Sequence, residues 1–252
     1  MAKINGTDLL VYADGTLIAY QKTCTVSWEQ DLPDATTKDS GGWEEHLNGT
    51  RRSTCDFDGL YSTTGLSAED LITYITGRTS CVLVINGTGV PIVGEARPKN
   101  LSVNAAMEEP GSISGSFTYD GPAWMLTGDY VALATGWSSA SLETFTSSGI
   151  KITSAIETSG SGVISSTPAE MDWSTGDVLK AVFFLTLNSG TLPTIKLYDT
   201  NGGGILSNAV TLVEGVNICT MTATGDGTDG NIRIQCEANV NFSTSDIYIF
   251  KT

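Results

Sequence analysis

The chain is divided along most of its length into short runs of apolar and β-branched residues, separated by glycine-, asparagine- or aspartate-containing turns. An example lies near the start, where residues 9–13 and 16–20 flank Asp14-Gly15, a dipeptide that favours a type I′ hairpin turn. Charged residues make up only 16% of the 252 residues, too few for the exposed faces of a helical bundle. The sequence therefore predicts a mainly β protein.

One helix signal interrupts the strands of the first half. Ser67 is placed to cap a helix, and Asp70 follows at the capping-box position. The apolar stripe of this helix consists of Leu71, Ile72 and Ile75. Strand patterns surround it at residues 24–28, 53–58, 81–85, 92–96, 101–105 and 112–119. We therefore expect an α+β domain over residues 1–130, a β-sandwich or barrel with one flanking helix.

The second half shows strand patterns and no helical period. A boundary is expected near residues 121–136, after which serine and threonine become more frequent. Strands are predicted at residues 150–156, 178–187, 194–198, 209–212, 217–222, 231–236 and 247–250. Short strands separated by turn signals are typical of a jelly-roll or Ig-like β-sandwich, which we assign to residues 131–252.

A long segment without sustained periodicity separates two strands of the first domain. Residues 31–52 contain Pro33 and three glycines, at 41, 42 and 49. Loops of this length are uncommon within a compact domain and usually have a function or are mobile. We expect this segment to be disordered in the free subunit and to become ordered on contact with a partner.

The overall charge argues against a protein that grips nucleic acid. The formal net charge is −15, and the 13 lysines and arginines form no cluster. An acidic surface is compatible with simple solubility, and also with a wall past which DNA slides without sticking. The five cysteines lack metal-ligand spacing, so free thiols in a reducing cytoplasm are expected. The sequence contains no signal segment or membrane span.

Catalytic and metal-binding patterns are absent from the sequence. The single histidine, His46, lies beside Glu44 and Glu45, but a metal site needs three or four converging ligands. A nucleophilic triad would also have to use this one histidine. Trp137 and Trp173 could stack on a sugar ring, although large aromatic residues are more often part of a core or interface. We therefore predict no enzyme, no cofactor and no metal.

Residues 1–125 resemble the major tail protein (tail tube) family of long-tailed phages with non-contractile tails. The resemblance lies in four segments in order, residues 3–12, 36–45, 59–61 and 109–117. It implies subunits that join their sheets in rings of six, rings that stack head to tail, and a long loop that reaches the next ring. The loop residues to which this role would fall are Asp31, Pro33, Asp34, Lys38, Trp43, Glu44 and Glu45.

The same resemblance implies the partners and the location. The partners would be further copies of the chain and the tape-measure, tail-terminator and baseplate proteins, with DNA passing through transiently. The protein would be made and assembled in the host cytoplasm and would end in the virion tail. Membranes would play no part.

Residues from about 136 onward resemble carbohydrate-binding-module-like or Ig-like β-sandwiches that are appended to virion proteins. The resemblance lies in residues 174–187 and 189–193. It implies an outward-facing accessory domain and identifies no binding residue. Trp137 and Trp173, named above from residue type, are the candidate contacts to surface glycans.

Two other functions fit the sequence. One is a free carbohydrate-binding or adhesin protein, in which the C-terminal sandwich binds glycans. The other is the inner tube of a contractile tail or injection device. A surrounding sheath leaves little room for an appended domain, which argues against this second alternative.

Overall fold

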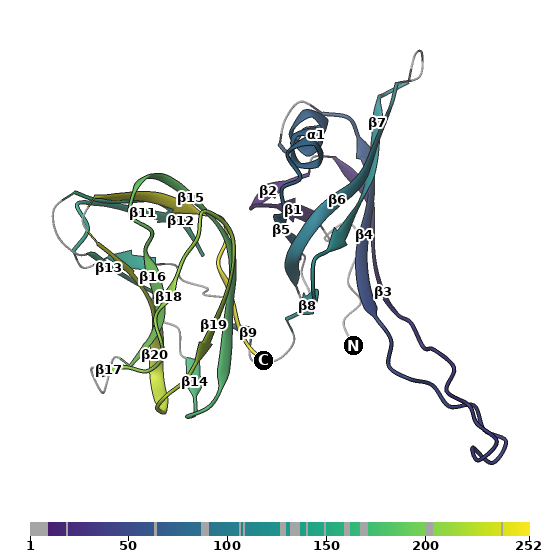
Figure 1. Ribbon diagram of the computed structural model, residues 1–252. Helices are drawn as coiled ribbons and strands as arrows, with labels where there is room; N and C mark the ends of the chain where they lie inside the picture. Colours follow the sequence, from purple (N-terminus) through teal and green to yellow (C-terminus); the bar gives the residue numbers. More distant parts are fainter. Residues whose placement is uncertain are drawn as a thin grey trace, which may run out of the picture.

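A computed structural model describes the chain in two β units that lie side by side (Figure 1). The described residues are 10–18, 20–62, 65–86, 91–105, 107, 109–126, 130–131, 137–139, 141–148, 150–158, 162–166, 171–199, 204–237 and 239–252. Within these ranges no helix has the length and apolar character needed to cross a membrane. The molecule is mainly β with one helix, as the sequence predicts.

The first unit is a curled antiparallel sheet with one helix. Its strands lie in the order β2-β1-β5-β6-β7-β4-β3, with β8 beside β6. The elements are β1 (Leu10–Ala13), β2 (Thr16–Leu17), β3 (Gln21–Gln30), β4 (Arg51–Leu60), α1 (Ala68–Gly77), β5 (Cys81–Asn86), β6 (Ile92–Asn104), β7 (Ser112–Tyr119) and β8 (Trp124–Met125). The strands at the two ends of this order are β2 and β3, so no other described strand pairs with the outer edge of β3.

Local sequence signals set the first hairpin and the helix. Asp14 and Gly15 have φ angles of 50° and 78°, as the predicted type I′ turn requires. The Ser67 hydroxyl accepts a hydrogen bond from the Asp70 amide, and the Asp70 carboxylate accepts one from the Ser67 amide. This is the predicted capping box, and it satisfies two backbone donors at the start of α1.

The predicted apolar stripe of α1 is only partly correct. Leu71 is buried, whereas Ile72 and Ile75 are exposed. Adjacent residues on a helix point about 100° apart, so Ile72 cannot share the face of Leu71. The core of this unit lies between the helix and the concave side of the sheet. Its fully buried side chains include Val11, Ile18, Cys55, Leu71, Cys81, Leu83 and Phe117.

The two strands predicted at residues 92–96 and 101–105 form a single strand, β6. β6 runs unbroken from Ile92 to Asn104, and the ladder to β7 shifts register between Pro98 and Asn100. A bulge at this point accommodates the proline, which has no amide to donate. The sequence break at Pro98 therefore marks an irregularity within a strand.

The second unit consists of two antiparallel sheets around a common core. One sheet has the order β10-β13-β20-β16-β17, and the other β11-β12-β21-β15-β22-β9. The strands are β9 (Tyr130–Val131), β10 (Trp137–Ser139), β11 (Thr144–Ser148), β12 (Lys151–Glu157), β13 (Gly162–Ser166), β14 (Met171–Trp173), β15 (Val178–Gly190), β16 (Thr194–Asp199), β17 (Gly204–Ile205), β18 (Val210–Thr211), β19 (Gly215–Thr222), β20 (Gly227–Cys236), β21 (Val240–Thr244) and β22 (Tyr248–Lys251). β14 pairs with β20, β18 with β16, and β19 with β15.

The two units share an apolar contact. Val82, Val84 and Val93 of the first sheet form one buried cluster with Val182 and Phe250 of the second unit. Apolar burial of this kind holds the units against each other more firmly than a linker alone would. The five cysteines are free thiols, and four of them are buried.

Candidate assembly and channel surfaces

A two-stranded arm projects from the first unit between β3 and β4 (Figure 1). We call Asp31–Thr50 the arm. Backbone hydrogen bonds continue the ladder beyond the two strands, from the Asp31 amide to Thr50 at 2.9 Å and from the Leu47 amide to Pro33 at 2.9 Å. The expectation of a disordered loop is therefore not met, because the segment forms a paired hairpin.

The end of the arm is a tight turn that presents an aromatic ring. Gly41 and Gly42 both have positive φ angles, 63° and 88°, which favour glycine. The Trp43 amide donates to the Ser40 carbonyl at 3.1 Å, and the Trp43 side chain is 80% exposed. Leu32 and Leu47 are also exposed along the arm. These exposed apolar residues make the arm a candidate contact surface.

The structure places all the predicted loop residues on this arm. Asp31 accepts a hydrogen bond from the Thr50 hydroxyl at 2.5 Å. Asp34 accepts one from the Thr36 amide at 2.8 Å. Hydrogen bonds from the Thr36 side chain and then from its amide lower the pKa of the Asp34 carboxyl below its usual range. Pro33 contributes its carbonyl to the ladder, and Glu44 lies 3.9 Å from His46. Lys38 and Glu45 are exposed near the tip.

On β3, β4, β7 and β6, the side of the sheet that faces away from the core is polar; we call this side the outer side. Along β4, Cys55 and Phe57 are buried in the core, so the alternating residues Asp56 and Asp58 point to the other side. The ladder places further short polar side chains beside them. We call this set the polar face: Thr23, Thr25, Ser27, Thr54, Asp56, Asp58, Asn100, Ser102, Ser114, Ser116 and Thr118.

The arginines at the arm end of the polar face are paired with acids. Arg52 donates to Glu29 at 2.6 Å, and Arg97 donates to Asp120 at 2.8 Å. Both guanidinium groups are thereby compensated locally. The polar face itself carries carboxylates, hydroxyls and amides, which are groups that repel or tolerate a phosphate backbone.

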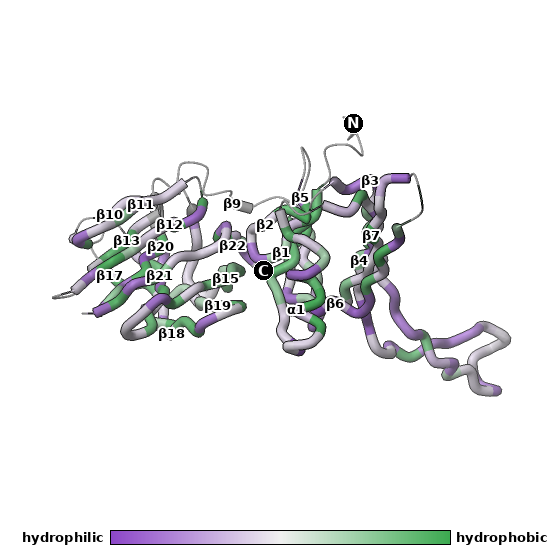
Figure 2. The backbone as a smooth tube through the Cα atoms, turned by 90° about the horizontal axis from the view of Figure 1, so that it is seen from above, coloured by the Kyte–Doolittle hydropathy of each residue, from purple (hydrophilic) through white to green (hydrophobic). Residues whose placement is uncertain are grey.

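The outer side of the same sheet is apolar on β1 and β5. Tyr12, Val82 and Val84 lie there, and the second unit covers them. Trp124 of β8 extends this contact, with its ring centroid 5.5 Å from that of Phe250. Figures 1 and 2 show β3, β4 and β7 on one side of the first unit and the second unit on the opposite side. The curl of the sheet thus turns its polar and apolar parts away from each other.

The two tryptophans proposed for glycan contact are buried. Trp137 is 4% exposed and its indole N–H donates to the Ile150 carbonyl at 3.2 Å. Trp173 is 3% exposed, and its ring lies so close to β20 that only glycine fits at Gly227 and Gly230. A sugar needs an open ring face to stack on, so neither tryptophan can form the predicted platform.

The metal-ligating residue types do not gather into a site in the described part of the chain. The residues described include no group of three His, Cys, Asp or Glu side chains that could hold an ion. His46 lies on the arm, away from the buried cysteines.

Sequence reasoning missed the polar face as a surface. The signal was present in the alternation of residues 53–58 and 112–119, whose polar members occupy the positions between the core residues. The strand order, which aligns these polar residues across four strands, could not be predicted from the sequence.

An edge strand without a described neighbour and a projecting arm with exposed apolar residues are features expected of a subunit that assembles with others. Residues 4–123 match the family described as "Phage tail tube protein". These residues, just under half of the chain, make the first unit a phage tail tube domain, and the chain is a structural subunit of a phage tail within the virion.

Solved structures give more distant likenesses. A chain from the virion of a native gene transfer agent particle is 19% identical, with a TM-score of 0.44, covering 49% of this chain and 98% of that one. A chain from the tail of an empty gene transfer agent particle is 17% identical with a TM-score of 0.43, covering 49% and 98%. The hub protein Dit of phage SPP1 is 11% identical with a TM-score of 0.32, covering 97% and 99%. No curated protein sequence matches the chain.

Proposed function

We propose that this chain is the repeating subunit of a tail tube, forming stacked rings around a channel through which DNA is delivered. The observation that carries the proposal is that the outer side of the first sheet is polar on one part and apolar on another. The second unit covers its apolar part on β1 and β5 and lies away from its polar face (Figure 2). In a ring, the polar face would line the channel.

The composition of the polar face suits this role. Asp56 and Asp58 are the carboxylates at its centre, flanked by serine and threonine hydroxyls on β3 and β7. Negative charge repels the phosphate backbone, and short hydroxyl side chains offer no aromatic ring for bases to stack on. DNA would pass such a wall without being held.

The open edge of β3 supports ring formation. An unpaired edge is a site of uncontrolled pairing unless a neighbour occupies it. Pairing of β3 with the sheet of the next copy would join the sheets into one wall. The ring size of six follows from the family resemblance.

The second unit would lie outside the tube. It covers the side of the first sheet that faces away from the polar face (Figure 2). With the polar face toward the channel, the second unit points outward, as expected of an accessory domain. The arm would then contact the neighbouring ring through Trp43 and the exposed residues beside it.

Negative-stain electron microscopy of the purified chain, over a range of concentrations, tests this function. Rings or hollow tubes with outward knobs are expected, and class averages of end-on rings give the number of copies. Uniform small monomers at every concentration would contradict the proposal.

A further inference from the structure

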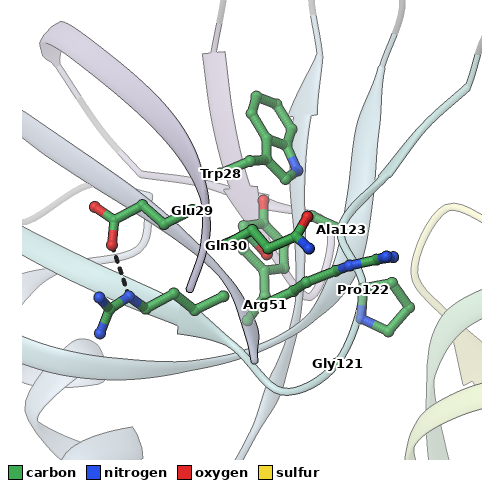
Figure 3. Close-up of a pocket in the computed structure, with 10 residues that line it drawn as sticks. Trp28, Glu29, Gln30, Arg51, Gly121, Pro122 and Ala123 are labelled. Atoms are coloured by element: carbon green, nitrogen blue, oxygen red, sulfur yellow. Dashed lines mark hydrogen bonds and ion pairs between the residues drawn. The ribbon is translucent and has the colours of Figure 1, made fainter. Parts of the chain in front are cut away.

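A pocket of about 630 Å³ opens at the end of the first sheet where β7 ends and the arm begins (Figure 3). Trp28, Tyr119, Pro122 and Ala123 provide apolar walls, and Arg51 provides a charge. Figure 3 shows Trp28 and Arg51 on different sides of the pocket, with Arg51 extended toward Pro122. The size is that of a site for a side chain or small ligand.

The strand registers explain why the pocket exists. Trp28 pairs with Ser53 on β4, and Tyr119 pairs with Ala96 on β6. Ser53, Tyr119 and Ala96 are buried on the concave side of the sheet, whereas Trp28 is 48% exposed. The pocket is therefore the end of the apolar interior, left uncovered at the base of the arm.

Two groups in the pocket lack a partner. The Tyr119 hydroxyl is buried and has no hydrogen-bond partner among the described residues. Burial raises the pKa of Tyr119, so the hydroxyl keeps its proton and is available as a donor. Arg51 makes no ion pair within the described ranges, whereas the adjacent Arg52 is paired with Glu29. A buried donor without an acceptor is costly, which favours an occupant that supplies one.

The opposite end of β7 carries the matching chemistry. Met107 lies in the connection between β6 and β7 and is 90% exposed, the highest value among the exposed large hydrophobic residues described. Glu109 is exposed two residues further along. The eight residues of β7 separate this connection from Tyr119 by roughly 27 Å at about 3.4 Å per residue. A subunit cannot place its own Met107 in its own pocket.

We propose that the pocket receives Met107 of a second copy stacked on the first, with Glu109 of that copy facing Arg51. This inference rests on the proposed head-to-tail stacking and names a contact separate from the arm. A methionine thioether packs well against aromatic rings, here Trp28 and Tyr119, and is a weak acceptor for the Tyr119 hydroxyl. A projection at one end of a strand and a pocket at its other end form a heterologous contact, which builds a filament when successive copies are stacked along one axis.

Charge reversal tests the proposed contact. Arg51→Glu and Glu109→Arg are each expected to raise the critical concentration for tube formation at least tenfold, measured by sedimentation of the full chain. The double variant Arg51→Glu/Glu109→Arg is expected to return to within about threefold of the unaltered protein, because the pair is re-formed with opposite sign. Lys99→Glu, the same charge change on an exposed lysine of β6, is the control and should assemble normally.

A second pair of variants tests the apolar part. Met107→Ala is expected to raise the critical concentration about tenfold, whereas Ile205→Ala, an exposed apolar residue of the second unit, should not. Thermal unfolding of each variant confirms that it is folded.

Three outcomes would overturn the proposal. Normal assembly of Met107→Ala and Arg51→Glu, with Trp43→Ala defective, would leave the tube function standing and remove this contact. A defect of Arg51→Glu that deletion of residues 2–8 reproduces and Met107→Ala does not would assign the pocket to the chain's own first residues. Failure of the unaltered protein to assemble would reject both the contact and the tube.

Discussion

The Gln21 side chain pairs with the backbone of Val11 in the manner of a neighbouring strand. Its carbonyl oxygen accepts from the Val11 amide at 2.9 Å, and its Nε2 donates to the Val11 carbonyl at 2.8 Å and to the Ile18 carbonyl at 2.7 Å. β1 and β3 lie far apart in the strand order. One side-chain amide therefore bridges the two sides of the curled sheet.

Replacing the Gln21 amide should destabilise the first unit, because it removes the hydrogen bonds between β1 and β3. Gln21→Met keeps the length of the side chain and removes all three of these hydrogen bonds, although the Val11 carbonyl keeps the one from the Ile18 amide at 3.0 Å. At about 1 kcal/mol for each lost hydrogen bond, we expect a loss of roughly 2–3 kcal/mol in the free energy of unfolding, measured by urea denaturation. The control is Gln30→Met, on the same strand as Gln21, which removes an exposed hydrogen bond to Asn48 of the arm. It should lower the free energy of unfolding much less. Equal effects of the two variants would contradict this account.

Asp14 should give the first unit a pH-dependent stability. Its carboxylate accepts from the Tyr74 hydroxyl at 2.6 Å and the Val82 amide at 2.7 Å, yet burial raises the pKa of Asp14 from 3.8 to about 6. The folded state then binds a proton more readily than the unfolded state. The stability contributed by this proton is complete below about pH 4 and is lost as the pH rises through about 6.

Asp14→Asn should remove that dependence. Asparagine tolerates the positive φ of this turn and stays neutral. From pH 4 to pH 7, the variant should gain stability relative to the unaltered protein, by up to about 3 kcal/mol for a shift of two pKa units. Urea denaturation at both pH values measures the gain. Asp246, whose pKa burial also raises, is present in both proteins, so it cancels in the difference. A difference that is the same at both pH values would show that Asp14 does not titrate as described.

Trp43→Ala should impair stacking more than folding. The ring is exposed in the single subunit, so its loss should leave the midpoint of thermal unfolding nearly unchanged. Tube formation should require at least about tenfold more protein, since a tryptophan buried on stacking contributes several kcal/mol. Sedimentation of tubes measures this concentration. Normal polymerisation of the variant would remove the arm tip from the stacking contact.

A chain without the second unit should stay soluble only if the apolar surface that this unit covered is made polar. Deleting residues 127–252 uncovers Val82, Val84 and Val93, so the shortened chain is expected to aggregate. The same deletion with Val82→Thr and Val84→Thr keeps the β-branched shape and makes the surface polar, and it should form tubes without knobs. Electron microscopy distinguishes tubes from aggregates. Complete loss of assembly in the repaired chain, if it is folded, would refute the proposed division between a tube domain and an accessory domain.

Reversing the charge of the polar face should make the channel retain DNA. Tubes of Asp56→Lys/Asp58→Lys are expected to hold short DNA in a form protected from nuclease, because lysine attracts the phosphate backbone. Asp172→Lys/Glu214→Lys carries the same change on exposed residues of the second unit and should bind DNA only in a nuclease-sensitive form. Protection by the second pair and not by the first would place the polar face outside the tube.

The parts of the fold that depend on neighbours in the sequence could be predicted. The Asp14-Gly15 turn and the Ser67 cap are local, because the residues that determine them lie within four positions of one another. β11, with the sequence Thr-Phe-Thr-Ser-Ser, was missed because it lacks the apolar alternation of a half-buried strand. Short serine- and threonine-rich strands at the border of a sandwich give little signal.

The candidate surfaces depend on long-range pairing and could be predicted only in part. Trp43 and its neighbours were found through the resemblance, but the paired arm was not expected. Val82 and Val84 read as members of a buried strand, without any indication that the second unit covers one side of it. Trp137 and Trp173 were named for glycan contact from residue type alone, and their burial follows from the packing of two sheets.

A three-dimensional electron microscopy reconstruction of the assembled protein tests the central claim most directly. The account predicts a hollow tube in which Asp56 and Asp58 line the channel and the second unit stands on the outer surface. A tube with the second unit inside the channel, or with the polar face on its outer wall, would contradict it.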